Sequence, residues 1–440
     1  MSIEIIKKKL DSAISQLSEL SWMFSKNPEK DFTRNRKLPF DKVISIILSM
    51  EGGSISSELL RHFGCTSDVA SSSAFIQQRG KINSDAFPSL FDLFVKKTDR
   101  NQLYKGFRLI AADGSDIHIP TNPDDLDSYF PDSDKRSAYS MLHLDAMYDL
   151  LQHTYTDALI LGKRKANERS SLYKMIERSP IKNALLILDR GYESYNLMAH
   201  AQEKGWNFLV RIQDILSSRS IAAGLDLPSE DEFDVPINLS IFTKQTNTLK
   251  KLFQDRNHFK HVHPENFDFL PKKNRKHEPT IFYQLPFRIV RFKITDNSYE
   301  TVVTNLDQND FPPEELKLLY GMRWGIETSF RELKYTIGLL HFHAKKVEYI
   351  YQEVFAKLIM YNFTELITLH VIIQKSDTKY AYKANFSVAV HVCRQLFLGN
   401  ISPPEVEALI CRFISPIRPG RHRPRKITVK HAVSFAYRIA

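Results

Sequence analysis

The sequence contains few cysteines, and none of them is close to another along the chain. Its three cysteines are Cys65, Cys393 and Cys411, and no Cys-x-x-Cys pair occurs. This spacing excludes a thiolate zinc signature and the disulfide framework of a small secreted domain. We therefore expect a protein of the reducing cytoplasm.

A secretion signal and long apolar stretches are also missing. The first twenty residues alternate charged and apolar side chains, without the continuous apolar core of a signal peptide. The longest apolar run near this end, residues 43–50, is too short to cross a bilayer. We find no internal repeat and no low-complexity block, and we expect a protein without a membrane association.

Acidic residues are absent from residues 415–440, where seven lysines and arginines gather. The whole chain has a net charge of +10 and a pI of about 9.2, so the remainder carries only +3. Such a charge favours a polyanionic partner, with nucleic acid ahead of an acidic membrane surface. The tail is either a disordered solubilising end or an arm that contacts phosphates.

The chain is long enough for about two to four globular domains, with 440 residues of which 42% are hydrophobic. Residues 1–95 have a helical pattern. Within them, a periodic run at residues 57–63 is followed by a second predicted helix that carries Arg79 and Lys81. Two short helices of this kind are typical of a helix-turn-helix, and equally of a plain helical hairpin.

From about residue 105 the pattern changes to strands. Residues 107–112 predict an apolar strand that ends at Asp113 and Gly114. Two more strands follow, with Asp149 at the turn between them, and a helix begins at Asn167.

A continuous apolar run at residues 184–188, which stops at Asp189, predicts a strand buried on both faces. A short helix and a strand at residues 207–212 come next. The order is three strands, helix, strand, helix, strand, which predicts a mixed sheet covered by helices.

The alternation of strands and helices is lost between residues 214 and 305, where loops and strands predict a β-rich insertion. This segment contains four histidines, His258, His261, His263 and His277. No cysteine lies nearby, so we interpret them as part of a solvated loop in preference to a metal site. Helical patterns return after the Pro312-Pro313 pair.

The stretch YGMRWGIETSFRELK places four polar residues on one face of a predicted helix. With Tyr320 at zero and about 100° per residue, Arg323, Glu327 and Lys334 fall at about −60°, −20° and −40°. The opposite face is apolar and can enter a core. A charged stripe of this kind is commonly a solvated face. It could also present a carboxylate for a metal ion beside cations for phosphate.

Three carboxylates stand out as a possible site: Asp113, Asp189 and Glu327. The two aspartates follow buried strands, and sites in open α/β sheets form at that edge. Gly114 would let a ligand approach the backbone. Hard oxygen ligands suit Mg²⁺ or Mn²⁺ shared with substrate phosphates, and two such ions about 3.5–4 Å apart would hold the attacking and leaving oxygens of a phosphodiester. Each aspartate alone is commonly a turn residue, but together the three favour a nuclease-type site.

These motifs together resemble the DDE transposases of bacterial insertion sequences, in the superfamily marked by the signature Tyr-x2-Arg-x3-Glu-x6-Lys. The sequences AADGS around Asp113 and LDRGY around Asp189 are similar to the first two aspartate motifs of that family. The segment that begins at Arg34 also resembles its N-terminal domain. The residues that match the signature are Tyr320, Arg323, Glu327 and Lys334.

The resemblance implies an α/β fold with a ribonuclease-H-like mixed sheet and helices on both faces. A β-rich insertion would interrupt this sheet, and an N-terminal helical DNA-binding domain would precede it. The implied boundaries are 1–95 for the DNA-binding domain, 96–213 and 306–375 for the catalytic core, 214–305 for the insertion and 376–440 for a C-terminal helical region with the basic tail.

The resemblance also implies an enzyme, a cut-and-paste DNA transposase that cleaves transposon ends and transfers the strands to target DNA. Asp113, Asp189 and Glu327 would be the catalytic metal ligands for two Mg²⁺ or Mn²⁺ ions. The partners would be double-stranded DNA and a second copy in a synaptic homodimer, in the bacterial cytoplasm at the nucleoid. The residues implied to contact DNA are Tyr320, Arg323, Lys334, Arg211, Arg190 and Tyr299, the last as a stacking partner for an unstacked base.

Two alternatives stay open. A metal-dependent DNA nuclease or a domesticated transposase would use the same carboxylates without strand transfer. An inert DNA-binding remnant of a decayed element would do neither, although such a copy would be free to lose the carboxylates or the polar stripe, and both are intact.

Overall fold

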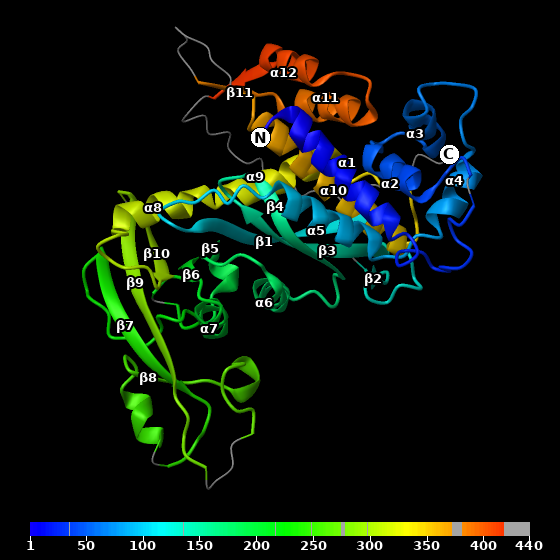
Figure 1. The fold of residues 1–440 in the computed structure, drawn as a ribbon. Helices are drawn as coiled ribbons and strands as arrows, with labels where there is room; N and C mark the ends of the chain where they lie inside the picture. The colour runs from blue at the N-terminus through cyan, green and yellow to red at the C-terminus, as the bar shows by residue number, and fades with distance from the viewer. Residues whose placement is uncertain are drawn as a thin grey trace.

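The computed structural model describes most of the chain. The described residues are 1–34, 36–134, 136–215, 217–247, 249–273, 278–296, 298–371 and 381–417. A long sheet runs through the middle of the molecule, with a layer of helices along one face and the helices α6 (Glu168–Arg178) and α7 (Tyr195–Glu203) on the other (Figure 1). The basic tail from residue 418 onward and His277 lie outside the described residues.

The sheet is mixed, which confirms the predicted α/β class. Its strands lie in the order β2-β3-β1-β5-β6-β10-β9-β7-β8, and β4 also pairs with β3. β3 is antiparallel to both β1 and β4, whereas β1, β5 and β6 are parallel to one another. The bounds of these core strands are β1 Arg108–Ile119, β2 Tyr129–Phe130, β3 Tyr139–Asp149, β4 Thr154–Gly162, β5 Ala184–Leu188 and β6 Asn207–Arg211.

The central strands β1, β5 and β6 each face two different hydrophobic clusters. On β1, Leu109 and Ala111 belong to the cluster shared with the long helical layer, whereas Ile110 and Ala112 face helices α6 and α7. Alternate residues of a strand point to opposite faces, so a central strand must be apolar throughout. β5 fits this requirement with five consecutive buried aliphatic residues.

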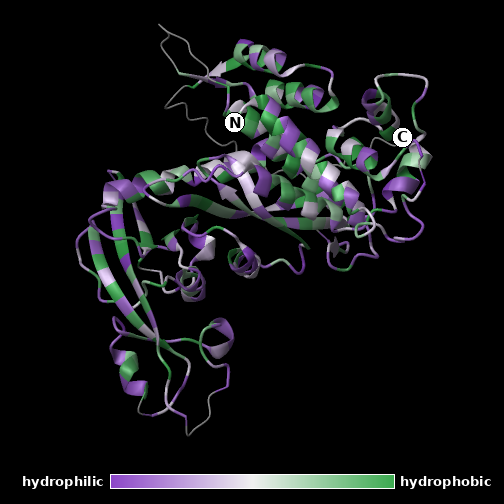
Figure 2. Cartoon of the chain, in the orientation of Figure 1, coloured by the Kyte–Doolittle hydropathy of each residue, from purple (hydrophilic) through white to green (hydrophobic). Residues whose placement is uncertain are grey.

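The strands between residues 214 and 305 continue the same sheet. β10 (Ser298–Thr304) pairs antiparallel with β6, β9 (Tyr283–Thr295) pairs with β10, and β7 (Phe233–Phe242) pairs with β9. Hydrophobic and hydrophilic residues alternate along β7 and β9 (Figure 2). The short elements of this segment are β8 Phe259–His261 and the 3₁₀ turns Leu249–Gln254 and Pro264–Asn266.

The described histidines of this segment have ordinary structural partners. His258 pairs with Asp255 at 2.8 Å, and the His261 ring lies 3.2 Å from a backbone carbonyl oxygen. Among the described residues, no group of three or more His, Cys, Asp or Glu side chains is arranged to hold a metal ion.

The N-terminal helices share a core with a long helix from much later in the sequence. α10 (Val347–Thr368) is buried on nearly all sides, because α1, α2 and α5 pack on it from one side and β4 from another. These helices therefore rest directly on the layer that covers the sheet. Their bounds are α1 Ile3–Glu19, α2 Phe40–Ser49, α3 Ile55–His62, α4 Ser72–Arg79 and α5 Ala86–Thr98.

The arginine of the predicted helix-turn-helix points inward. Arg79 is only 3% exposed, and its guanidinium donates to Glu353 at 2.8 Å and to Gln352 at 3.0 Å, both on α10. The helices α3 and α4 form where the sequence predicts them. Arg79 holds α4 against α10, however, and is not available to DNA as a helix-turn-helix reading would require.

The helix predicted from YGMRWGIETSFRELK is interrupted twice. α8 (Pro313–Met322) ends before Arg323, where i→i−3 hydrogen bonds tighten the chain, and α9 (Trp324–Glu332) continues from there. A π-helical turn at Leu333–Ile337 follows. The apolar side of the predicted wheel is buried as expected, apart from the half-buried Met322.

The C-terminal part adds a small helical unit on α10. α11 (Phe386–Leu398) packs against α10, and α12 (Pro403–Arg412) packs against α11. The short strands β11 (Tyr382–Ala384) and β12 (Ile414–Pro416) pair beside them. Within the ranges that the structure describes, no helix is long and apolar enough to cross a membrane.

Candidate active site

Asp113 lies in the middle of β1, and the prediction that the strand ends there is wrong. β1 keeps its pairing with β3 through Ile119. It is β5 that ends here, because the parallel register pairs Ala111 with Ile187 and β5 stops at Leu188. Asp113 and Asp189 stand two residues beyond that pair. Since paired strands lie about 4.8 Å apart, the two aspartates, one within β1 and one directly after β5, lie side by side.

Glu327 approaches the aspartates from the helical layer. Asp113 has the same strand parity as Leu109 and Ala111, so its side chain points to the face on which α9 packs. Glu327 lies in the first turn of α9. Three carboxylates from distant parts of the sequence are thus gathered on one face of the sheet.

The electrostatics of Asp113 reflect this gathering. Burial is the main cause that raises the pKa of Asp113 to about 7, and the negative charges of Asp189 and Glu327 raise it further. The N–H of Gly114 and the charge of Arg323 act in the opposite direction but do not offset burial. A nearby cation would favour the ionised form of this carboxyl group.

One oxygen of each carboxylate is held by a local donor. Asp113 accepts from the N–H of Gly114 at 2.9 Å, and Asp189 accepts from the N–H of Gly191 at 2.8 Å. Glu327 accepts from the guanidinium of Arg323 at 2.6 Å.

The donor set fits a hard divalent cation. All three groups are carboxylates, which suit Mg²⁺ and Mn²⁺, and a cation between them would relieve their mutual repulsion. The carboxylates would have to turn toward a shared ion, since their present arrangement is not that of a metal-bound group.

Two guanidinium groups meet beside Tyr320. The charges of Arg323 and Arg211 both act on its hydroxyl, although burial dominates and raises the pKa of Tyr320. Arg323 also lies over the rings of Tyr320 and Trp324, at 5.6 and 5.2 Å from their centroids. Tyr320 and Arg323 are each 4% exposed, so the polar stripe is not a solvated helix face.

Arg211 reaches this place from the end of β6. Its guanidinium pairs with Glu300 of the neighbouring β10 at 3.3 Å. Arg211 also interacts with Tyr320, so the structure brings it beside two other residues that were predicted to contact DNA.

Lys334 and Arg190 each follow one of the carboxylates in the sequence, Glu327 and Asp189 respectively. Lys334 is in the π-helical turn, close enough to His118 that its charge adds to burial in lowering the pKa of that imidazole. Arg190 is exposed and directly follows Asp189.

Unlike Arg211, Tyr299 does not lie on the face of the sheet that carries the three carboxylates. On β10, Val302 faces the helical layer and Val303 faces the opposite cluster, so Tyr299 points away from the face that Arg211 occupies. Its hydroxyl donates to Asp231 at 3.2 Å, and Arg291 lies over its ring at 5.0 Å.

A known protein family matches more than half of the chain. The family described as transposase DDE domain matches residues 104–363, a range that holds all three carboxylates. The chain belongs to this family of DDE transposases. The resemblance predicted from the motifs is thereby confirmed.

One curated protein and one solved structure are similar to this chain. This chain is 25% identical to the transposase InsG for insertion sequence element IS4 of Escherichia coli (strain K12). The matched stretch is 299 residues long and covers 66% of this chain. The chain spans 59% of the length of that relative. The piggyBac transposase synaptic complex with hairpin DNA, solved by cryo-electron microscopy, has a TM-score of 0.43 and 10% identity over 95% of this chain and 84% of that chain.

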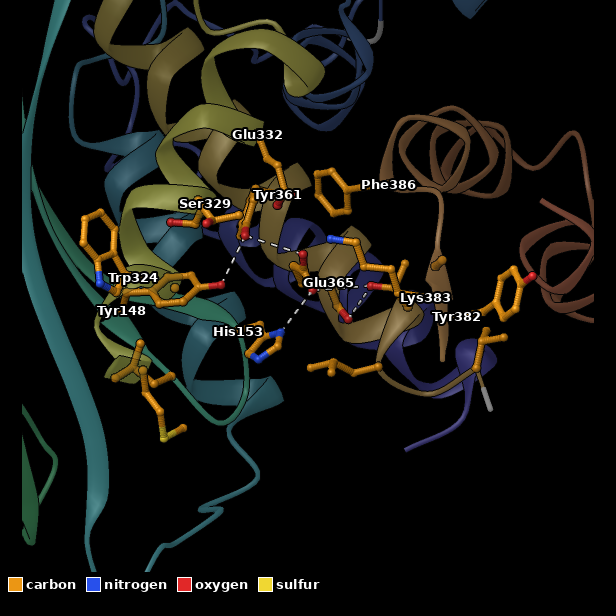
Figure 3. A pocket seen from close by; sticks show the side chains of 18 residues that line it. Tyr148, His153, Trp324, Ser329, Glu332, Tyr361, Glu365, Tyr382, Lys383 and Phe386 are labelled. Atoms are coloured by element: carbon orange, nitrogen blue, oxygen red, sulfur yellow. Dashed lines mark hydrogen bonds and ion pairs between the residues drawn. The ribbon is translucent and has the colours of Figure 1, made fainter. Parts of the chain in front are cut away.

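The structure also has a cavity of about 690 Å³ that the sequence did not indicate, lined both by the matched DDE domain and by residues after it. Figure 3 shows Trp324, Ser329 and Glu332 of α9 on one side of it and Glu365 of α10 on another. Burial raises the pKa of Glu365 to about 8, and the charge of Glu332 adds to that effect. Glu327 does not line this cavity, so it is separate from the three carboxylates.

A second group that sequence reasoning missed surrounds His143 on β3. Its partners come from β1 and α6, so the contacts join residues 27 and 25 positions away along the chain. No local motif marks such a cluster. The one sequence feature beside the cluster is Gly114, because a Cβ atom at that position would lie 2.4 Å from His143 Nε2.

Proposed function

We propose that this chain is a cut-and-paste DNA transposase that cleaves transposon ends and transfers the resulting strands to target DNA. The observation that carries the proposal is the gathering of Asp113, Asp189 and Glu327 on one face, with the pKa of Asp113 raised to about 7. Carboxylates that repel one another beside two guanidinium groups are suited to a cation and a phosphodiester together.

We propose that the core is ribonuclease-H-like and that residues 214–305 form its β-rich insertion. The strand order β4-β3-β1-β5-β6, antiparallel in its first three members and parallel in its last three, supports this assignment. Residues 1–95 are proposed as a DNA-binding part. Its contact with DNA would involve side chains other than Arg79.

Asp113, Asp189 and Glu327 would hold two Mg²⁺ or Mn²⁺ ions, which supply Lewis-acid stabilisation of the attacking and leaving oxygens. Arg323 keeps the Glu327 carboxylate in place through its hydrogen bond, and the rest of its guanidinium would bind a phosphate once DNA reaches this buried position. Arg211 and Tyr320 lie beside it and would bind the same backbone. Lys334 and Arg190 would extend this contact along the strand.

The proposed partners are double-stranded DNA and a second copy of the chain in a synaptic homodimer. The net charge of +10 supports a polyanionic partner. The proposed location is the bacterial cytoplasm at the nucleoid, consistent with a relative named for an insertion sequence element. Tyr299 keeps its proposed stacking role only if DNA reaches the opposite face of β10.

The test uses a supercoiled plasmid that carries the ends of the element. Wild-type protein and Asp189→Asn are each incubated with Mg²⁺ or with EDTA, and excision and integration products are measured. We expect Mg²⁺-dependent excision and integration by the wild type and neither by the variant.

The other outcomes correspond to the alternatives. Cleavage without joining would identify a nuclease or a domesticated enzyme. Binding without cleavage under every condition would identify an inert DNA-binding protein, and would mean that the three carboxylates do not assemble with metal.

A further inference from the structure

A buried histidine lies on the far face of β1, directly behind the stretch that carries Asp113. His143 is 2% exposed. Its Nδ1 lies 2.5 Å from a carboxylate oxygen of Asp116, and its Nε2 lies 3.2 Å from an oxygen of Asp145 and 3.2 Å from an oxygen of Glu168. Three carboxylates therefore surround one imidazole ring.

The ring occupies the space that a side chain at position 114 would need. A Cβ atom on Gly114 would lie 2.4 Å from His143 Nε2 and 2.9 Å from Glu168 Oε1. Both approaches are shorter than any real Cβ contact. Gly114 is thus required for the close approach of His143, and on this face there is no room for the ligand that the sequence reading expected.

The charges in the cluster keep the ring protonated. Burial opposes the charged ring, but the carboxylates of Asp116, Asp145 and Glu168 outweigh it and raise the pKa of His143 to about 11. Lys163 is a further cation of the cluster, and its Nζ lies 2.6 Å from Asp116 Oδ1 and 3.1 Å from His143 Nδ1. The imidazolium joins β1, β3 and the first turn of α6.

The same backbone segment holds the candidate ligand Asp113. Asp116 pairs with His143 and Gly114 pairs with Asp145 in the antiparallel register of β1 and β3. The N–H of Gly114 donates to Asp113 Oδ1 at 2.9 Å. The ring therefore lies against Gly114, whose backbone N–H orients the Asp113 carboxylate on the other face of the sheet.

We propose that His143 is a positioning residue for Asp113, acting through the backbone of Gly114. The inference rests on the proposed function, because it gives Asp113 a metal to hold. A purely structural role for the cluster makes a different prediction: loss of the ring would lower stability without changing the properties of folded molecules.

The experiment compares His143→Gln with the matched variant His200→Gln. His200 is a half-buried histidine on α7 that pairs with Asp268 at 3.1 Å, far from β1 in the sequence. Each variant is measured for its urea midpoint, its affinity for duplex DNA, its single-turnover cleavage rate and its affinity for Mn²⁺ without DNA. The binding and cleavage measurements are made without urea, so that they compare folded protein only.

We expect His143→Gln to weaken Mn²⁺ binding and slow cleavage by about tenfold or more, because small displacements of a reacting group have effects of that size. DNA affinity should stay within about twofold, since no phosphate contact is removed. His200→Gln should change neither. Unchanged Mn²⁺ affinity and cleavage in folded His143→Gln would overturn the inference.

A double-mutant cycle tests the route through Gly114. Gly114→Ala should weaken Mn²⁺ binding in the wild type, because the new Cβ atom displaces the ring. The same change should have little further effect in the background of His143→Ala, where the ring is absent. Equal effects in both backgrounds would contradict the proposed route. A wild-type protein that neither binds Mn²⁺ nor cleaves DNA would overturn the proposed function, and this inference with it.

Discussion

At the residue scale, the charged form of Asp113 lowers the stability of the metal-free fold. Its carboxyl group is partly buried among Asp189 and Glu327, and its pKa is raised to about 7 by burial first and by those charges second. At neutral pH the folded protein must hold this group close to the point of ionisation. A site that binds a cation needs such repulsion, which the cation then relieves.

Asp113→Asn should therefore stabilise the metal-free protein in a pH-dependent way. The pKa of Asp113 is about 7 in the folded chain and near 3.8 when unfolded, so the folded state binds the proton more tightly between these values. Its contribution to stability is full below about pH 4 and is lost as pH rises through 7. We expect the variant to gain about 2 kcal/mol over wild type at pH 8, after allowance for partial exposure, and little at pH 4.

Urea unfolding in EDTA at the two pH values measures this difference. Asp116→Asn is a suitable comparison, because hydrogen bonds from His143 and Lys163 outweigh burial and lower the pKa of Asp116 to about 2. That variant should lose stability at pH 8. An equal gain for Asp113→Asn at both pH values would show that its carboxyl group is not strained by its neighbours.

At the scale of elements, local patterns predicted more than pairings between distant segments did. The run at β5 and the helix that begins after Asn167 formed as predicted, because an unbroken apolar stretch and an N-cap are local signals. The N-cap is visible as a hydrogen bond from the N–H of Ser170 to Asn167 at 3.0 Å. The helical wheel likewise predicted which side of α8 and α9 is buried.

The differences arise where non-local contacts decide. β1 continues past Asp113 because β3 pairs with it through Ile119, and nothing near Gly114 in the sequence indicates that partner. The break at Arg323 and the π-helical turn depend on hydrogen-bond spacing, which hydrophobic periodicity does not record. The site residues were predicted from motif spacing, but their burial and the His143 cluster depend on the folded sheet.

The α4–α10 contact allows a test of an element. Arg79→Met should destabilise the chain by about 3–5 kcal/mol, because it leaves Glu353 buried without its guanidinium partner. The double variant Arg79→Met/Glu353→Met should recover most of this loss. Urea unfolding measures both, and Ile76→Ala, at an exposed position of the same helix, serves as the control. If Arg79→Met instead lost DNA affinity while its stability stayed unchanged, Arg79 would be a DNA contact.

At the scale of the whole molecule, one sheet and one helix connect all parts of the chain. The sheet extends from β4 through the core to β7 and β8, and α10 carries both the N-terminal helices and the C-terminal unit (Figure 1). The carboxylates lie where this sheet meets α9: Asp113 is within β1, Asp189 directly follows β5, and Glu327 is in the first turn of α9. The central claim is that this meeting point is a divalent-metal site that cuts DNA.

Replacement of one carboxylate by a thiolate tests that claim most directly. Asp189→Cys is compared with wild type in single-turnover cleavage of DNA that carries the element's ends, in Mg²⁺ and in Mn²⁺. A thiolate is a poor ligand for the hard Mg²⁺ and a better one for Mn²⁺. We predict that the variant is inactive in Mg²⁺ and regains part of its cleavage in Mn²⁺. Full activity in Mg²⁺, or wild-type cleavage that persists in EDTA, would contradict the account.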